Sequence, residues 1–367
     1  MKSKKFVAGL MTLAMSFAFT ACSGGAGNTP AGNNATSADK ASVTATSTET
    51  ATTENKEGAK KIAVLLYKAD DTYIATVRQA LEKLDEADPD VELSFQDAGG
   101  DMGTQTDQIN NVLAQGVDGI LLNIVDVKAA PTAISTIEAK NIPTVFFNRD
   151  MSESIGDKTD EFLFVGTNAA DAGVMQGEML SKLWNEKSEE IDRNGNGVLD
   201  YVMLNGGVDN PEAQARTEYS VKTLEDAGIK TNELALQDAQ WETEKAKTAM
   251  DSWLQTFDKD LDVVIANNDG MAIGAITALQ AVGYNTGEDG ATVIPVVGVD
   301  ATEQAKEAIA KGTMFGTVLQ DADGMAKGSL AAIKNKINGK DWIDSTDLKL
   351  ADDGVSIRIP YQIYDGK

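Results

Sequence analysis

The sequence of 367 residues has no histidine, a single cysteine, Cys22, and few aromatic residues, which make up 6% of the chain. Without histidine, the chain cannot contain a histidine general base, a triad that depends on histidine, or a histidine metal ligand. Basic residues are also scarce, because 32 Lys and Arg stand against 57 Asp and Glu and the net charge is −25. Phosphate binding needs a basic surface, so we do not expect a nucleic acid as a partner.

Long apolar runs are missing as well, since no segment reaches the roughly 18 apolar residues of a membrane-spanning helix. The N-terminus instead has the pattern of an export signal: lysines within the first five residues precede an apolar stretch at residues 6–19. Cys22 follows Thr-Ala and precedes Ser-Gly-Gly, as in the lipid acceptor site of bacterial lipoproteins, although Phe19 stands where Leu is usual. We therefore expect a lipoprotein signal peptide at residues 1–21 and a lipid on Cys22. The alternative is a signal peptide followed by an unrelated cysteine.

Two segments of different composition follow the predicted signal peptide. Residues 22–59 are rich in Ser, Thr, Ala, Gly and Asn, and such a segment cannot bury enough apolar surface to become ordered, so we expect a flexible tether. Beyond residue 60, short apolar runs alternate with amphipathic stretches, which is typical of parallel sheets covered on both faces. The sequence therefore predicts the α/β class, and its length favours two domains. The apolar runs are residues 62–67, 119–125, 144–147, 162–165, 201–204, 263–266, 293–299 and 315–319.

Polar residues stand where most of these runs end. In open α/β sheets, ligands bind outside the carboxyl ends of the strands, and Asn and Asp offer the donors and acceptors that a polyhydroxylated ligand needs. The alternative is that these residues only begin loops and cap helices. The residues are Asp70, Asp71, Asn123, Asn148, Arg149, Asn267, Asn268, Asp269, Asp300, Gln320 and Asp321.

Residues 192–200, with the sequence Asp-Arg-Asn-Gly-Asn-Gly-Val-Leu-Asp, have the spacing of a calcium-binding loop. Oxygen-bearing side chains occupy positions one, three, five and nine, and glycine occupies position six, as at the start of an EF-hand loop. Position twelve, which should hold a bidentate Glu, is Met203, and residues 201–204 have the pattern of a strand. Either a carboxylate reaches the loop from elsewhere in the fold, or the loop is an ordinary polar turn.

Taken together, several segments make the chain similar to the galactose/glucose-binding proteins of bacterial ABC transporters, which belong to the type I periplasmic binding proteins. The similarity extends from about residue 61 to residue 361 and rests on residues 67–71, 123–126, 143–148, 213–217, 240–241, 265–269 and 298–300. This resemblance implies two Rossmann-like domains with parallel sheets, joined by a three-segment hinge, that close on a sugar. One domain would contain residues 60–142 and 321–357, and the other residues 143–320 and 358–367.

The resemblance also implies a sugar site. Tyr73 and Trp241 would enclose the sugar, because the C–H face of a sugar ring fits an aromatic plane. The family commonly has Phe at the Tyr73 position, and three polar positions of the site depart from it as well: Asn210 replaces His, Glu212 replaces Asp and Gln320 replaces Asn. These departures bear on which hexose is bound, because a site built for one pattern of hydroxyls rejects others. The polar residues that match the family are Asp71, Asn123, Arg216, Asn268 and Asp300.

The family also binds a structural calcium ion, and the resemblance implies that the loop of residues 192–200 does so here. The last ligand would be Asp262, where the family usually has Glu; because Asp is shorter, we expect a lower affinity. The implied ligands are Asp192, Asn194, Asn196, the backbone carbonyl of Val198, Asp200 and Asp262.

The sequence therefore predicts a non-catalytic, monomeric sugar receptor that delivers galactose or glucose to an ABC transporter permease. A lipid on Cys22 would hold it on the outer face of the cell membrane, which is the periplasm in a Gram-negative cell; whether a chemoreceptor is a second partner stays open. Two alternatives come from other classes. A secreted, calcium-stabilised glycoside hydrolase would use Asp71 and Asp300 as its carboxylate pair. A repressor-like regulator would need an N-terminal helix-turn-helix and a basic face.

Overall fold

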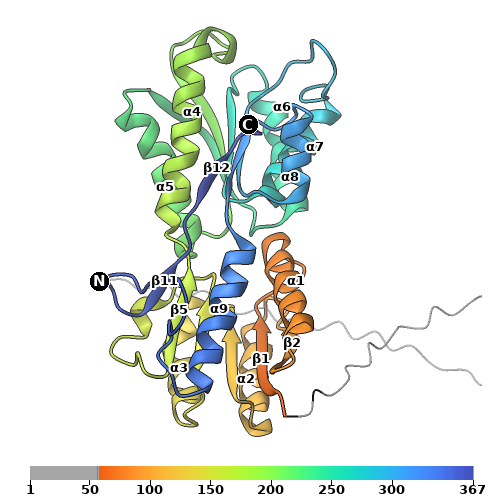
Figure 1. The fold of residues 1–367 in the computed structure, drawn as a ribbon. Helices are drawn as coiled ribbons and strands as arrows, with labels where there is room; N and C mark the ends of the chain where they lie inside the picture. Colours follow the sequence, from red (N-terminus) through yellow and green to blue (C-terminus); the bar gives the residue numbers. More distant parts are fainter. Residues whose placement is uncertain (1–55, 57, 367) are drawn as a thin grey trace, which may run out of the picture. The chain divides into compact units, whose positions relative to one another are not determined.

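The computed structural model describes residues 56 and 58–366, so the predicted signal peptide, Cys22 and most of the predicted tether lie outside the described residues. Two six-stranded sheets form the framework of the described part, with the orders β11-β5-β4-β3-β1-β2 and β12-β10-β9-β8-β6-β7 (Figure 1). Neighbouring strands are parallel, apart from the antiparallel pair of β10 and β12. The predicted α/β class with two mostly parallel sheets is confirmed. The described helices include none with the length and apolar character needed to cross a membrane.

The first sheet is covered by helices on both faces. Its first strand, Lys-Lys-Ile-Ala-Val-Leu-Leu, is apolar at consecutive positions because successive side chains point to opposite faces. Ile62 and Val64 face α1 and α9, whereas Ala63 and Leu65 face α2 and α3. The strands are β1 (Lys60–Leu66), β2 (Val91–Asp97), β3 (Gly119–Leu122), β4 (Thr144–Phe147), β5 (Phe162–Gly166) and β11 (Ser356–Arg358). The helices are α1 (Thr72–Ala87), α2 (Met102–Gln115), α3 (Ala130–Glu138), α9 (Ala322–Ile337) and the short η1 (Val127–Ala129) and η2 (Ser152–Ser154).

The second sheet is also covered on both faces, by α4 and α5 on one and by α6, α7 and α8 on the other. Helices α4 and α5 approach closely at Gly177, where an added Cβ would lie 2.6 Å from the backbone oxygen of Ser220. The strands are β6 (Leu199–Asn205), β7 (Thr231–Asp238), β8 (Val263–Ala266), β9 (Val296–Asp300), β10 (Gly316–Leu319) and β12 (Gln362–Tyr364). The helices are α4 (Ala169–Ile191), α5 (Pro211–Asp226), α6 (Thr243–Phe257), α7 (Asp269–Ala281) and α8 (Glu303–Ala310).

The chain passes between the two sheets three times: from β5 to α4, from β10 to α9 and from β11 to β12. The boundary predicted at residue 143 is wrong, because β4 and β5 pair with β3 and therefore belong to the first domain. Arg358 was also expected in the second domain but ends β11, which pairs with β5 in the first. The three crossings thus lie at residues 167–168, 320–321 and 359–361.

Candidate functional site

Loops at the carboxyl ends of strands from both sheets line one cavity, whose space between atoms, open solvent included, is about 370 Å³. The first domain contributes Tyr67, Asp71, Tyr73, Asn148 and Arg149; the second contributes Asn210, Glu212, Arg216, Trp241, Asn268 and Asp300; Gln320 comes from the second crossing.

Nine of the ten residues predicted for a sugar site line this cavity, and Asn123 is the exception. The Asn123 side chain is fully buried and its amide joins the ends of neighbouring strands. Its Oδ1 accepts from the Tyr67 N–H at 3.4 Å, and its Nδ2 donates to the Phe147 carbonyl and to Asn148 Oδ1, both at 3.2 Å. Asn123 therefore holds the loops that form the cavity instead of lining it.

Three of the predicted residues cap the helices that point at the cavity. Asp71 Oδ1 accepts from the Tyr73 and Ile74 N–H groups at the start of α1. Asn210 caps α5 and Asn268 caps α7 in the same way. One side chain can therefore both cap a helix and line the cavity. This is possible because the capping residue lies between the end of a strand and the start of a helix, where the cavity opens. The partial positive charge of these helix N-termini favours nearby carboxylates.

The lining contains four buried polar atoms that have no hydrogen-bond partner within the described residues. Two are carboxylate acceptors, Glu212 Oε2 and Asp300 Oδ2, and two are donors, Arg216 Nε and Gln320 Nε2. A buried polar group without a partner costs about 1–3 kcal/mol, so such groups are few in native proteins. Four of them around one cavity indicate a ligand that both donates and accepts hydrogen bonds.

Arg216 donates three hydrogen bonds from its guanidinium group. Its Nη1 donates to the Asn267 carbonyl at 2.7 Å, and its Nη2 donates to Gln320 Oε1 and to the Tyr361 hydroxyl, both at 2.8 Å. Burial lowers the pKa of Arg216, but Tyr361 and Asp300 outweigh burial and the net pKa is raised. The guanidinium is therefore a fixed positive charge at the back of the cavity.

Asp300 is held in a strained backbone conformation, with φ of 125°, and Ala301 follows with φ of 54°. The neighbouring carboxylate of Asp269 supports this turn: its Oδ2 accepts from the Thr302 N–H at 2.8 Å, and its Oδ1 accepts from Thr317 Oγ1 at 2.6 Å. Burial raises the pKa of Asp300 well above its usual range, and the charge of Asp269 adds to this effect. Burial also raises the pKa of Asp269, to about 7.

Two aromatic side chains predicted to enclose a sugar both line the cavity. The Trp241 indole lies against the backbone of Gly206, where an added Cβ would come within 2.4 Å of ring atoms. Trp241 and the preceding Gln240 have φ of 64° and 53°, which is unusual for residues with side chains and is often found at functional sites. Tyr73 is buried, and its hydroxyl lies 3.6 Å from Met325 Sδ.

Tyr67, Asn148 and Arg149 also line the cavity, although they are not among the ten residues predicted for the sugar site. The Arg149 guanidinium carbon lies 3.6 Å from the centre of the Tyr67 ring, and the Tyr67 hydroxyl donates to Asp71 Oδ2 at 2.6 Å. The position of Asn148 and Arg149 at the end of an apolar run was the signal that pointed to them. Tyr67 follows β1 directly, but nothing in its spacing indicates where its ring lies.

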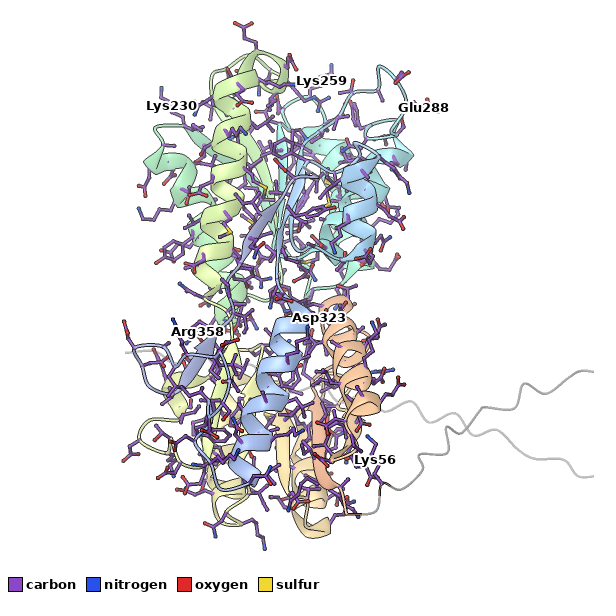
Figure 2. All side chains as sticks on the ribbon, viewed as in Figure 1. Lys56, Lys230, Lys259, Glu288, Asp323 and Arg358 are labelled. Carbon is purple, nitrogen blue, oxygen red and sulfur yellow. The ribbon has the colours of Figure 1, made fainter. Side chains whose placement is uncertain are left out.

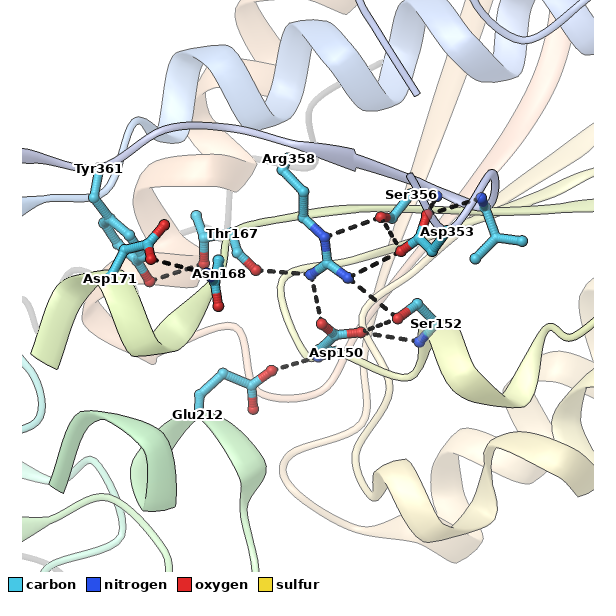
Figure 3. Close-up of polar contacts among 11 residues, drawn as sticks. Asp150, Ser152, Thr167, Asn168, Asp171, Glu212, Asp353, Ser356, Arg358 and Tyr361 are labelled. Atoms are coloured by element: carbon cyan, nitrogen blue, oxygen red, sulfur yellow. Dashed lines mark hydrogen bonds and ion pairs between the residues drawn. The ribbon is translucent and has the colours of Figure 1, made fainter. Parts of the chain in front are cut away.

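Direct contacts link the two domains beside the cavity. The Asp150 N–H donates to Glu212 Oε1, as Figure 3 shows. Lys68 Nζ lies 3.4 Å from Glu242 Oε1. Burial raises the pKa of Glu212, against the effects of this backbone N–H and of nearby arginines. Glu212 therefore contributes both to the lining and to the contact between the domains.

The loop of residues 192–200 brings its predicted calcium ligands together around backbone and amide donors. The Asp192 carboxylate accepts from the Gly195 and Gly197 N–H groups, both at 2.8 Å. Asn194 Nδ2 and Asn196 Nδ2 donate to Asp200 Oδ2 at 2.9 and 2.8 Å. Val198 donates its N–H to Asn196 Oδ1 at 2.7 Å, and its carbonyl is the predicted ligand.

Asp262 lies under this loop and is fully buried. Its two oxygens accept from the N–H groups of Arg193 and Asp200 at 2.9 and 2.8 Å. Burial raises its pKa to about 6, and the charges of Asp200 and Asp192 contribute. The described residues contain no group of three acidic, cysteine or histidine side chains arranged around a common metal position. The donor set nevertheless fits a hard cation, because its carboxylate and amide oxygens are the ligands that Ca²⁺ prefers.

A family model described as a periplasmic binding protein domain matches residues 62–341. The D-galactose/methyl-galactoside binding periplasmic protein MglB of Haemophilus influenzae is 34% identical over 302 residues, which are 82% of this chain and 88% of the relative. A putative rhizopine-binding protein of Rhizobium meliloti is 32% identical over 75% of this chain and 84% of its own length.

Solved structures have the same fold. An ABC transporter solute binding protein from Bacillus halodurans with bound myo-inositol has a TM-score of 0.69 and 27% identity, and the match covers 84% of this chain and 95% of that one. A periplasmic solute binding protein from Actinobacillus succinogenes with bound D-allose has a TM-score of 0.70 at 21% identity, over 84% and 98% of the two chains. The second match bears on the fold alone.

Proposed function

Because the chain belongs to the periplasmic binding protein domain family, we propose that it is the extracytoplasmic sugar-binding component of an ABC transporter. Its relatives are described as binding proteins, so the chain is a binding protein rather than an enzyme, as predicted. The glycoside hydrolase and the regulator have no support among these relatives. The ligand that we propose is an aldohexose, galactose or glucose.

The observation that carries this proposal is the set of four unpaired polar atoms in a cavity lined by Tyr73 and Trp241. Each sugar hydroxyl can donate one hydrogen bond and accept others. Glu212 Oε2 and Asp300 Oδ2 would accept from hydroxyls, and Arg216 Nε and Gln320 Nε2 would donate to them. The apolar ring faces would lie against the aromatic side chains.

The cavity takes residues from both domains, so a bound sugar would favour the arrangement in which they meet. A ligand can shift such an equilibrium only by its preference for one state, and contacts from both domains provide that preference. Closure would then present the loaded protein to the permease. A chemoreceptor that contacts the closed form is a second partner that the sequence leaves open.

A titration tests the assignment. Isothermal calorimetry and tryptophan fluorescence would be recorded with D-galactose, D-glucose, D-allose, D-ribose, xylitol and myo-inositol. We expect micromolar or tighter binding of galactose or glucose. Asp300→Asn should weaken it by about tenfold, since the substitution changes the hydrogen-bonding atoms of a buried group and leaving a buried polar group unpaired costs about 1–3 kcal/mol. Asp289→Asn, which makes the same substitution in an exposed loop, should not. A flat titration with all six compounds would end the proposal, and binding of myo-inositol alone would end only the hexose assignment.

Two finer parts of the function are also proposed. We propose that residues 192–200 and Asp262 bind a structural Ca²⁺, to which they would supply only oxygen ligands. We also propose that a lipid on Cys22, which lies outside the described residues, anchors the protein to the outer face of the membrane. Cys22→Ala should release the protein from membranes into the soluble fraction of cells, whereas unchanged membrane association would contradict the anchor.

A further inference from the structure

The hydroxyl of Tyr361 joins the three segments that cross between the domains. Tyr361 itself lies on the third crossing. Its hydroxyl accepts from Thr167 Oγ1, on the first crossing, at 2.8 Å, and lies 3.5 Å from its acceptor Gln320 Oε1, on the second. Its other bond comes from Arg216 Nη2 at 2.8 Å. One donated and two accepted bonds use the full capacity of a tyrosine hydroxyl.

The groups bound to this hydroxyl belong to the candidate sugar site. Arg216 and Gln320 line the cavity, and each directs an unpaired nitrogen to a buried position. The Arg216 guanidinium carbon lies 5.7 Å from the centre of the Trp241 ring and 5.9 Å from that of Tyr361. Arg216 is thus held between a wall of the cavity and a residue of the hinge.

A second route returns from the hinge to the cavity through Arg358, as Figure 3 shows. Its Nη1 donates to the Thr167 carbonyl at 2.9 Å and to the Asp150 carboxylate at 2.5 Å. The Asp150 N–H in turn donates to Glu212 Oε1. Thr167 is therefore bonded on both sides, through its hydroxyl to Tyr361 and through its carbonyl to Arg358. The hydrogen-bonded chain begins and ends on cavity residues of α5, Arg216 and Glu212.

We propose that the Tyr361 hydroxyl is a positioning group that couples the sugar contacts of Arg216 and Gln320 to the angle of the hinge. Hydrogen bonds need short distances and near-linear geometry, so one hydroxyl can bind all three partners only over a narrow range of hinge angles. A sugar that pairs with Arg216 and Gln320 would restrain the same groups. The inference rests on the proposed function for its ligand, but the effect on the hinge does not require a sugar.

Tyr361→Phe isolates the hydroxyl, because the ring, which packs in the core of the second domain, is retained. Tyr364→Phe is a matched control from the same end of the chain. The Tyr364 ring centre lies 5.9 Å from Lys306 Nζ, and its hydroxyl has no hydrogen-bond partner within the described residues. Thr167→Val removes one of the three bonds and provides a second variant if Tyr361→Phe does not fold.

The test measures interdomain distances and affinity in the full chain. Spin labels would be attached through Lys83→Cys and Lys259→Cys, two exposed sites in different domains, with Cys22→Ala in the background. Lys259 lies far from Arg358 and Asp323, which stand next to crossings (Figure 2). Distances would be recorded by pulsed electron resonance with and without D-galactose and D-glucose, and affinities by calorimetry.

We expect Tyr361→Phe to broaden the ligand-free distance distribution and to weaken sugar binding by about tenfold. Thr167→Val should act in the same direction but less, and Tyr364→Phe should leave both quantities unchanged. If the chain binds neither sugar while Tyr361→Phe still broadens the distribution, the hinge role stands and the hexose assignment falls. If the chain binds sugar and Tyr361→Phe changes neither distribution nor affinity, the coupling proposed for this hydroxyl is overturned.

Discussion

Glu212 Oε1, on the second domain, accepts a hydrogen bond from the backbone N–H of Asp150, on the first. Its other oxygen, Oε2, is buried in the candidate sugar site without a partner among the described residues. The proteins that the sequence resembles have Asp at this position, one methylene shorter. The Glu212 side chain makes a contact between the domains, so under the proposed function this departure would bear on closure as well as on the choice of sugar.

Glu212→Asp should therefore weaken sugar binding by about tenfold or more, because the shorter side chain loses its reach to Asp150 and a charge-assisted hydrogen bond with it. Glu212→Gln keeps the length and an acceptor oxygen, and should retain more affinity than Glu212→Asp. Calorimetry with the preferred sugar checks the order of the two variants. Equal affinities in both would show that length at this position does not matter.

Stability should depend on pH through Asp269. Burial raises its pKa to about 7, above the usual value near 3.9, so the folded state keeps a proton that the unfolded state loses. Its contribution to stability is present below the unfolded pKa and is lost as the pH rises to about 7. Between pH 4 and pH 7 this loss should be about 3 kcal/mol.

Urea unfolding of the sugar-free protein at several pH values measures this effect against Asp269→Asn. The variant cannot titrate at this position, so its free energy of unfolding should fall less between pH 4 and pH 7. The comparison with the variant matters because the net charge of −25 makes the folded state of both proteins repel itself more as the pH rises. Parallel curves for the two proteins would contradict the raised pKa.

Gly206 should be required for the position of Trp241. An added Cβ would come within 2.4 Å of the indole ring atoms, so Gly206→Ala must displace the ring from the cavity. We expect sugar affinity to fall by about tenfold, since aromatic contacts contribute about 0.5–1.5 kcal/mol beyond their buried area. Gly328→Ala is the control, because its added Cβ would meet nothing closer than 3.4 Å. Unchanged affinity in Gly206→Ala would mean that the indole does not contact the sugar.

Most residues of the cavity could be predicted from the sequence, because the end of a strand can be recognised from the few residues around it. Asp71, Asn268 and Asp300 each follow an apolar run, and the carboxyl ends of parallel strands meet at one edge of a sheet. The domain to which Asn148 belongs could not be predicted from such a local pattern. Its strand, β4, is as apolar as those of the second sheet, and only its pairing with β3 places it in the first domain. Pairing partners are set by crossover connections and packing, which periodicity does not encode.

The direction in which a side chain points is the other feature that could not be predicted from the sequence. Asn123 was predicted to contact a sugar from its place at the end of β3, but its amide binds the backbone of Tyr67 and Phe147. Tyr67 lines the cavity together with Arg149, whose guanidinium group lies over the Tyr67 ring. These two residues are far apart in the sequence. Neither outcome follows from composition or spacing, because both depend on which neighbours the fold brings within hydrogen-bonding or stacking distance.

Calcium should stabilise the fold without controlling sugar binding. The proposed ligands Asp192 and Asp200 lie near Asp262, and their charges disfavour its ionised form, a repulsion that a divalent cation would relieve. For Ca²⁺ to bind, the amide groups of Asn194 and Asn196 would rotate so that oxygen replaces the nitrogen that now donates to Asp200. The loop and Asp262 belong to one domain, so the ion would hold a loop to a strand end and would not span the hinge.

We therefore expect millimolar Ca²⁺ to raise the melting temperature and a chelator to lower it, whereas sugar affinity measured well below that temperature should stay within about twofold. Asp192→Asn should remove the response to Ca²⁺, and Asp226→Asn, an exposed acid at the end of α5, should keep it. Scanning calorimetry and sugar titrations on the same samples separate the two effects. Loss of sugar binding in chelator, at a temperature where the protein stays folded, would make the ion part of the sugar site. Equal melting temperatures with Ca²⁺ and with chelator would instead make residues 192–200 a polar turn, the alternative that spacing alone left open.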